Sequence, residues 1–217
     1  MEYLVNTMEF GDAILLAHLV GTIFGICAAY YFDTVLSKLC NTGVVTRRIY
    51  LSFRHAVKAC TFATALLWST SLIYISYLAN VRPESLTDPV FWAKITITAV
   101  ISVNLLLISN VAMPMAAKRI GVSIFGGLTN IQQDIMIAIG AISGISWISI
   151  VVLGFVKLNL NGQDSMTVYG SIVLVYTASL AIGLLLSKIG GHVIRRRFLH
   201  RMEQKKSNHR RIAGYLP

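Results

Sequence analysis

The chain has 217 residues, of which 55% are hydrophobic and only 13% are charged. A soluble globular domain carries roughly twice that share of charged residues, so the composition excludes an ordinary soluble protein. The formal net charge of +10 would suggest nucleic-acid binding in a soluble protein, but the placement of the basic residues between apolar segments explains this charge without nucleic acid.

Five apolar segments are long enough to cross a hydrocarbon core of ~30 Å, which takes about 20 helical residues. They lie near residues 10–31, 56–79, 91–112, 135–156 and 168–189. The predicted fold is therefore all-α: an integral membrane bundle of five transmembrane helices in a domain of residues 1–190, followed by a basic cytoplasmic tail of residues 191–217. Residues 1–9 are expected to form a short segment before the first helix, and their lack of a basic stretch disfavours a secretory signal peptide.

The basic residues predict the orientation of the bundle. Nearly all of them fall beside the connections after the first and third segments, at the end of the fifth segment, or in the tail; the exceptions are Arg82, Lys94 and Lys157. Because basic residues are retained on the cytoplasmic side, the N-terminus is predicted to lie outside and the C-terminus inside.

Two groups of arginines are expected to contact anionic lipid headgroups at the inner membrane surface. Arg47 and Arg48 lie in a connection expected over residues 33–55. Arg195, Arg196 and Arg197 lie in the basic tail. The bilayer is thus the predicted partner, together with a second copy of the chain or another membrane subunit.

His18 lies inside the first apolar segment, on the same narrow helical face as Gly21, Gly25 and Ala29. The two glycines allow a neighbouring helix to approach closely, so this face is predicted to point into the protein. An imidazole at this depth is costly unless it is satisfied or used. Two interpretations stay open: a ligand of haem or of a metal, or a hydrogen bond to a serine or threonine of the second or fifth segment.

The third segment carries Lys94, Thr98 and Ser102 at a spacing of four residues, which predicts a polar stripe facing the bundle. Lys94 is expected either to reach the level of His18 or to extend outward to the headgroups. Asn104, near the middle of the bilayer, needs an interhelical hydrogen-bond partner. Pro114 is expected to end this helix. The prolines lie outside the segments or at their ends, so the helices are expected to be unbroken, unlike those of transporters with discontinuous helices.

The fourth and fifth segments contain further close-packing patterns, Gly140-x-x-x-Gly144 and Ser179-x-x-x-Gly183-x-x-x-Ser187. Trp147 follows the first of these and is predicted to be buried near the middle of the membrane. It is interpreted either as a core residue with a hydrogen-bonded indole or as a contact to a cofactor.

Several of these motifs resemble those of known membrane proteins. A family of small five-helix bacterial membrane proteins of unsettled function has motifs similar to His18-x-x-Gly21-x-x-x-Gly25 with Asp33, Phe91-x-x-Lys94 with Asn104 and Pro114, and Ser143-x-x-Ser146-Trp147. More remotely, a histidine in the first helix and a lysine in the third resemble the HemJ-type protoporphyrinogen oxidases and the copper-resistance D-type membrane domains. This resemblance implies that His18 and Lys94 are the functional pair and that the chain resides in a bacterial inner membrane. The chain departs from these relatives after Asn104, where Ser109 stands in place of a histidine.

Three functions are consistent with the sequence. The first is a haem-, porphyrin- or redox-associated membrane protein, with His18 as the ligand of the cofactor or metal and Lys94, Asn104 and Trp147 as further cofactor-binding residues. The second is a non-enzymatic membrane subunit that assembles with a partner. The third is a small-solute or proton pathway, which the lack of acidic residues in the middle of the segments disfavours.

Overall fold

The computed structural model describes residues 2–42, 44–122, 128–155 and 164–213, without the side chains of residues 2–9, 33, 36–42, 191 and 193–213. The helices are α1 (Glu2–Thr42), α2 (Arg47–Val81), the 3-10 helix η1 (Pro83–Thr87), α3 (Pro89–Leu107), the π-helix η2 (Ile108–Ala112), α4 (Met113–Ala117), α5 (Asn130–Phe155) and α6 (Ser165–Ala213). Five helical stretches are long and apolar enough to cross a membrane: Phe10–Phe32, Arg47–Val81, Pro89–Ala117, Asn130–Phe155 and Ser165–Gly190. No strand occurs in the described ranges, so the predicted all-α class and the five helices of membrane-spanning length and composition are confirmed.

Short polar side chains cap the helices where the spans begin. The Thr46 hydroxyl accepts a hydrogen bond from the backbone N–H of Ile49 before α2, and the Asp88 carboxylate accepts one from Val90 before α3. Such caps satisfy backbone donors that a helix leaves free in its first turn. They fix the residue at which each helix enters the bundle.

Several helix ends differ from the predicted ones. Helix α1 begins at Glu2, not near residue 10, and it continues past Asp33 to Thr42. Helix α2 already begins at Arg47, so the connection expected over residues 33–55 is far shorter. Hydropathy marks only the part of a helix that crosses lipid, whereas the helical backbone can continue beyond it through polar residues, most of which tolerate a helix. Helix α6 likewise continues as far as Ala213, and Gly190 and Gly191, which cost about 1 kcal/mol each relative to alanine, do not break it.

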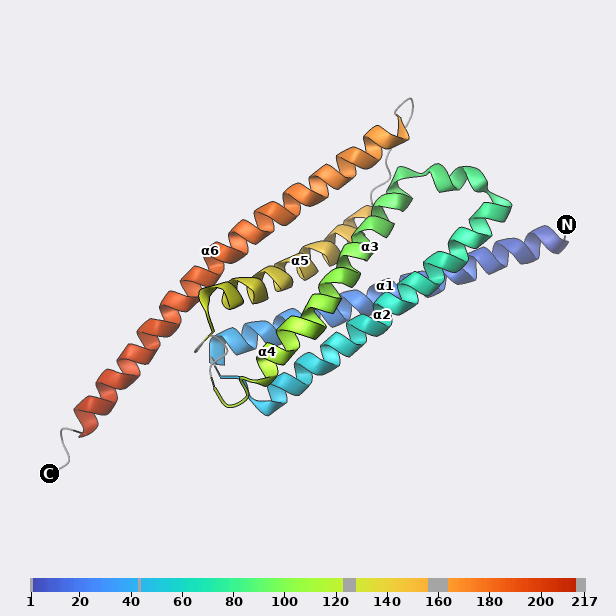
Figure 1. The fold of residues 1–217 in the computed structure, drawn as a ribbon. Coiled ribbons are helices and arrows are strands. Elements are labelled where there is room, and N and C mark those ends of the chain that lie inside the picture. The colour runs from blue at the N-terminus through green and yellow to red at the C-terminus, as the bar shows by residue number, and fades with distance from the viewer. Residues whose placement is uncertain (1, 43, 123–127, 156–163, 214–217) are drawn as a thin grey trace.

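The prediction that Pro114 ends the third membrane helix is wrong. Helix α3 passes into the π-helical turn η2, which is followed directly by α4, and Pro114 stands in the first turn of α4. A proline is tolerated there because the first turn of a helix does not need its N–H group. The three elements follow one path in Figure 1. The helix thus continues through η2 as one stretch, Pro89–Ala117, in which only the hydrogen-bond pattern changes, from α-helical to π-helical.

Helices α1 and α2 form a long antiparallel pair, and α3 and α5 pack beside this pair (Figure 1). Helix α6 lies on the outside against α5 and α3. The central core joins all five spans through the buried residues Ala29, Leu67, Ile97, Ile101, Trp147, Ile150 and Tyr176. We call the two ends of the bundle the η1 end and the α4 end, after the elements that lie there.

Glycines allow close contact between the helices, as predicted. A Cβ atom at Gly25 would overlap the Trp147 ring of α5, and one at Gly21 would press against Leu66 of α2. A Cβ atom at Gly183 would overlap the Ile145 side chain. The pair Gly21 and Gly25 thus faces two neighbours, because successive turns of α1 lie against α2 and α5.

Two hydrogen bonds between side chains attach α6 to the bundle. The hydroxyl oxygens of Tyr176 and Ser146 are 2.8 Å apart, and those of Tyr169 and Thr96 are 2.9 Å apart. Most of the remaining membrane-spanning surface of α6 is exposed. In a membrane bundle such bonds contribute about 0.6 kcal/mol each on average.

At the α4 end, the two connections of the chain are joined by backbone hydrogen bonds. Val45 donates to the carbonyl of Val122 at 3.0 Å, and Gly121 donates to the carbonyl of Val45 at 2.8 Å. Gly121 has a φ of +91°, which favours glycine. The sequence pattern contained no signal for this pairing, which fixes the start of α2 beside the end of α4.

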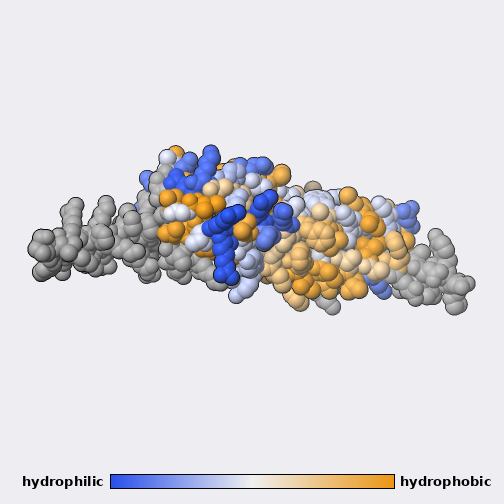
Figure 2. Space-filling view, turned by 90° about the horizontal axis from the view of Figure 1, so that it is seen from below, coloured by the Kyte–Doolittle hydropathy of each residue, from blue (hydrophilic) through white to orange (hydrophobic). Residues whose placement is uncertain are grey.

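On one face of the bundle, an apolar stretch adjoins a hydrophilic one. Figure 2 shows hydrophobic residues over the middle of the described bundle and hydrophilic residues gathered toward one end. Exposed basic residues of the α4 end are Arg47, Arg48, Arg54, Lys58 and Lys118. Arg47 and Arg48 are therefore available to lipid headgroups, whereas the side chains of Arg195, Arg196 and Arg197 lie outside the described residues.

Candidate functional site

A cavity of about 270 Å³ lies between α1, α2 and α3 near the η1 end. Its walls include His18 of α1 and Lys94 of α3, the two residues that the sequence analysis singled out. The full lining is Ile14, Leu15, His18, Thr22, Leu67, Trp68, Ser71, Tyr74, Asp88, Phe91, Lys94, Ile95, Thr98 and Ile150. The cavity thus combines apolar and aromatic walls with a few polar groups, as ligand pockets commonly do.

His18 is half-buried, and its ring is held by the neighbouring helix. Its Nδ1 atom lies 3.0 Å from the hydroxyl oxygen of Thr70 on α2. Thr70 itself is buried. The expected hydrogen bond between His18 and a hydroxyl of the second segment is therefore confirmed, and it fixes the orientation of the ring within the cavity.

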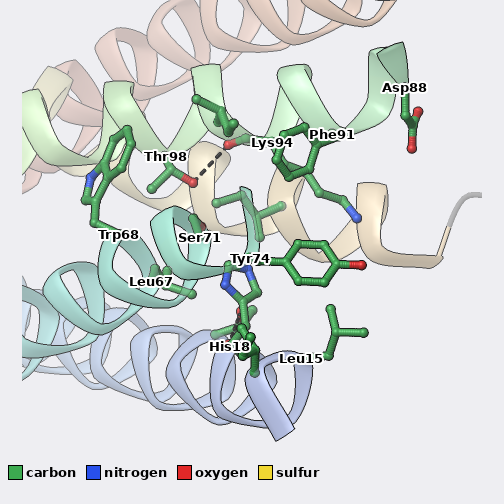
Figure 3. Close-up of a pocket in the computed structure, with 14 residues that line it drawn as sticks. Leu15, His18, Leu67, Trp68, Ser71, Tyr74, Asp88, Phe91, Lys94 and Thr98 are labelled. Carbon is green, nitrogen blue, oxygen red and sulfur yellow. Dashed lines mark hydrogen bonds between the residues drawn. The ribbon is translucent and has the colours of Figure 1, made fainter. Parts of the chain in front are cut away.

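Lys94 follows the capped start of α3 and is half-buried. In Figure 3 its ammonium group points toward the side of the cavity on which the Tyr74 hydroxyl and Asp88 lie. No ion pair between Lys94 and Asp88 is formed within the described part of the chain, and the Asp88 carboxylate caps α3 instead. Among the described residues, no carboxylate contacts Lys94 and neutralises its charge.

The polar stripe of α3 faces the bundle, as predicted. The Thr98 hydroxyl donates to the Lys94 carbonyl at 2.9 Å, and the Ser102 hydroxyl donates to the Thr98 carbonyl at 2.8 Å. The Trp68 indole of α2 donates to the Ser102 oxygen at 2.9 Å. This bond places Trp68 at the inner wall of the cavity, with Thr98 beside it (Figure 3).

Asn104 and Trp147 do not belong to this cavity. Both are 3% exposed, and both line a separate void of about 10 Å³ together with Ser143. The Asn104 amide donates to the Ile139 carbonyl of α5 at 3.1 Å, which confirms the expected interhelical partner. Its Oδ1 atom is buried without a partner. Of the four predicted cofactor-binding residues, His18 and Lys94 therefore line the cavity, whereas Asn104 and Trp147 line the separate void.

We expect Asn104→Leu to leave the thermal unfolding temperature of the purified protein at or above that of wild type. The change removes one interhelical hydrogen bond, worth about 0.6 kcal/mol in a membrane bundle. It also removes a buried oxygen without a partner, whose desolvation costs about 1–3 kcal/mol. The matched variant Asn104→Ala enlarges the void and should unfold at a lower temperature. A clear decrease for the leucine variant would mean that a bound water satisfies the oxygen.

A metal site would need more ligands than His18 alone. No group of three or more His, Cys, Asp or Glu side chains comes together among the residues that the structure describes. A metal or haem at His18 would therefore draw its other ligands from elsewhere. The Thr70 hydroxyl orients the His18 ring through Nδ1, as a hydrogen bond to the second ring nitrogen commonly does for a histidine that binds a metal.

The cavity also contains residues that the sequence analysis did not select, chiefly Trp68, Ser71 and Tyr74 of α2. Together with Leu67 they follow a spacing of three and four residues along one helical face. This spacing was a usable signal. It identifies the face but not which helix the face meets.

The motifs behind the family resemblance are distributed over α1, α3 and α5. His18 and Lys94, the pair that the resemblance to HemJ-type enzymes implies, line one cavity, whereas Asn104 and Trp147 line another. Comparison of the chain with protein-family models, with curated proteins and with solved structures finds no match, so the family remains an expectation based on these motifs.

Proposed function

We propose that this protein is a multi-pass protein of the inner (plasma) membrane and that its cavity binds a small amphiphilic anion. The observation that carries the proposal is the presence of Lys94, His18 and three aromatic residues in one cavity near the η1 end. With the N-terminus outside, as the basic residues predict, the cavity lies in the outer half of the membrane.

The Lys94 ammonium favours an anionic ligand, because Asp88, the acidic residue of the lining, caps the start of α3 instead of pairing with it. Lys94 is half-buried and forms no ion pair among the described residues. A lysine ammonium that is partly removed from water is stabilised by an opposite charge. A carboxylate or phosphate in the cavity would provide that charge.

The size of the cavity favours a compact ligand. Its volume of about 270 Å³ lies just below the range of about 300–1,000 Å³ for sites that hold drug-sized molecules. The side chains of Trp68, Tyr74 and Phe91 offer flat apolar surfaces to a ring. We therefore expect a ligand with a single aromatic ring or a short apolar body next to its anionic group.

Equilibrium dialysis with 4-hydroxybenzoate tests the proposal, with the protein in nanodiscs of phosphatidylcholine. This probe has one ring and one carboxylate. Methyl 4-hydroxybenzoate has the same ring without the charge and is the matched probe. We expect saturable binding of the acid and at least about tenfold weaker binding of the ester, because a hydrogen bond to a charged group contributes about 1.5–3 kcal/mol. Equal retention of both probes would contradict the proposal.

A haem or porphyrin is the second candidate ligand, and the orientation of the His18 ring by Thr70 favours it. Lys94 would then contact a propionate, and most of the macrocycle would lie outside a cavity of this size. Chemically, the bound group would supply electron transfer. The chain's own residues would orient it and neutralise its charge.

A visible spectrum before and after addition of dithionite tests this second candidate. If it is right, the purified protein has a Soret band that shifts on reduction and is absent in His18→Ala. His55→Ala, on an exposed part of α2, should leave the band unchanged. A colourless preparation would exclude a resident haem. If 4-hydroxybenzoate also fails to bind, the result would favour a non-enzymatic membrane subunit whose exposed α6 contacts a partner.

A further inference from the structure

We infer that Thr70 fixes the tautomer of His18, so that the cavity offers a hydrogen-bond acceptor and selects ligands that carry an O–H or N–H donor in addition to an anionic group. This inference rests on the proposed binding function and names the class of ligand more closely. It assigns a specificity-determining role to Thr70, a residue that does not itself line the cavity.

The first step concerns the single proton of the Thr70 hydroxyl. The hydroxyl oxygen lies 2.8 Å from the Leu66 carbonyl oxygen and 3.1 Å from the Leu67 carbonyl oxygen. Two oxygens this close repel each other unless a proton lies between them. The Thr70 proton must therefore point back at its own helix, in the way common for threonine within helices.

The second step concerns the His18 ring. Because the proton of Thr70 is already used, its oxygen can only accept from Nδ1, at 3.0 Å. Nδ1 then carries the hydrogen. In a neutral imidazole the other nitrogen, Nε2, has a free lone pair and is an acceptor. The bond to Thr70 is the one hydrogen bond of the ring within the described part of the chain, so Nε2 has no competing donor there.

The third step compares the two polar sides of the cavity. The Lys94 ammonium has three N–H donors and no acceptor, so it takes an anion. His18 Nε2 is an acceptor without hydrogen, so it takes a donor. The aromatic side chain of Tyr74 lies between these two groups in Figure 3. A matching ligand has a carboxylate or phosphate at one end and a hydroxyl or amine at the other, as in a hydroxy- or amino-substituted aromatic acid.

Two probes that carry the same negative charge, but of which only one has an O–H donor, measure the effect of the donor by itself. 4-Hydroxybenzoate carries an O–H group, whereas 4-methoxybenzoate has a methyl group in place of this hydrogen. A site built to bond a hydroxyl discriminates strongly against an analogue without it. We expect wild type to bind 4-hydroxybenzoate at least about tenfold more tightly than 4-methoxybenzoate. This affinity ratio should fall toward one in Thr70→Val, because valine keeps the shape of the side chain but lacks the oxygen that accepts from Nδ1. Thr70→Ser keeps the hydroxyl and should keep the ratio.

The tautomer can be measured without any ligand. In protein labelled with ¹⁵N-histidine at a pH of about 8, where an ordinary histidine is neutral, the ¹⁵N shifts should show a protonated Nδ1 and an unprotonated Nε2 for His18. The signal is assigned by its loss in His18→Gln. A protonated Nε2 in wild type, or equal binding of the two anionic probes, overturns the inference. Failure of both anionic probes to bind contradicts the proposed function instead, and the tautomer result then stands by itself.

Discussion

The variant Gly25→Ala should be less stable than wild type by about 1–3 kcal/mol, the usual cost of adding a methyl group to a packed core. The Cβ atom of an alanine at this position would overlap the six-membered ring of Trp147 on α5. Trp147 is 3% exposed and belongs to the central core. Neither α1 nor α5 can move away without separating the other helices packed around that core.

Gly170→Ala is the matched control, because no atom lies within 4 Å of a Cβ atom built at Gly170 in α6. It should be as stable as wild type or slightly more stable, since alanine favours helix over glycine. Thermal unfolding in one detergent, followed by circular dichroism, compares the two variants. Trp147→Phe provides a smaller ring, so the added cost of Gly25→Ala should shrink in that background. An unchanged cost would mean that the strain lies elsewhere.

The sequence predicts the existence of the helices well because the signal is strong: each apolar run is about as long as a bilayer is thick. It predicts their ends poorly, because a helix does not stop where the lipid stops. The Pro114 error has a related cause. A proline normally ends a helix, but the π-helical turn before it changes which N–H groups need a partner, and that turn has no clear signal in the sequence.

The site could be predicted in part. His18 and Lys94 lie at similar depths on different helices, which follows from counting residues at 1.5 Å per residue. The identity of Thr70 as the partner of His18 does not follow from counting. Helix α2 also offers the hydroxyls of Ser69 and Ser71, which lie about 100° to either side of Thr70 around the helix. The rotation of α2 about its own axis decides among them, and tertiary packing sets that rotation.

The same limit explains why the sequence alone groups Asn104 and Trp147 with His18. Position along the chain indicates the depth of a residue in the membrane, but depth says little about its lateral position within a bundle. The indole of Trp147 points at Gly25, about two turns further along α1 than His18. The core residues Leu67 and Ile97 pack with Trp147 in the central cluster, and this packing closes the inner side of the cavity.

The variant Lys94→Met should bind 4-hydroxybenzoate about 10- to 150-fold more weakly than wild type, the equivalent of losing one hydrogen bond to a charged group. Methionine keeps most of the apolar length of lysine but has no charge. Because Lys94 forms no ion pair among the described residues, its removal leaves no buried carboxylate without a partner. The folded protein should therefore survive the change, and thermal unfolding provides the check.

Two comparisons isolate the charge of Lys94 as the cause. Lys58→Met removes an exposed lysine near the α4 end and should leave binding of 4-hydroxybenzoate unchanged, so it controls for the net charge of the protein. Methyl 4-hydroxybenzoate, which has no charge for Lys94 to bind, should be held equally by wild type and by Lys94→Met. If Lys94→Met weakened the binding of the ester and of the acid by the same factor, the lysine would be shaping the cavity through its apolar stem. If Lys94→Met bound both probes as tightly as wild type, the ammonium would be directed to the lipid headgroups. The binding site of the anion would then lie elsewhere, with the basic α4 end as the next candidate.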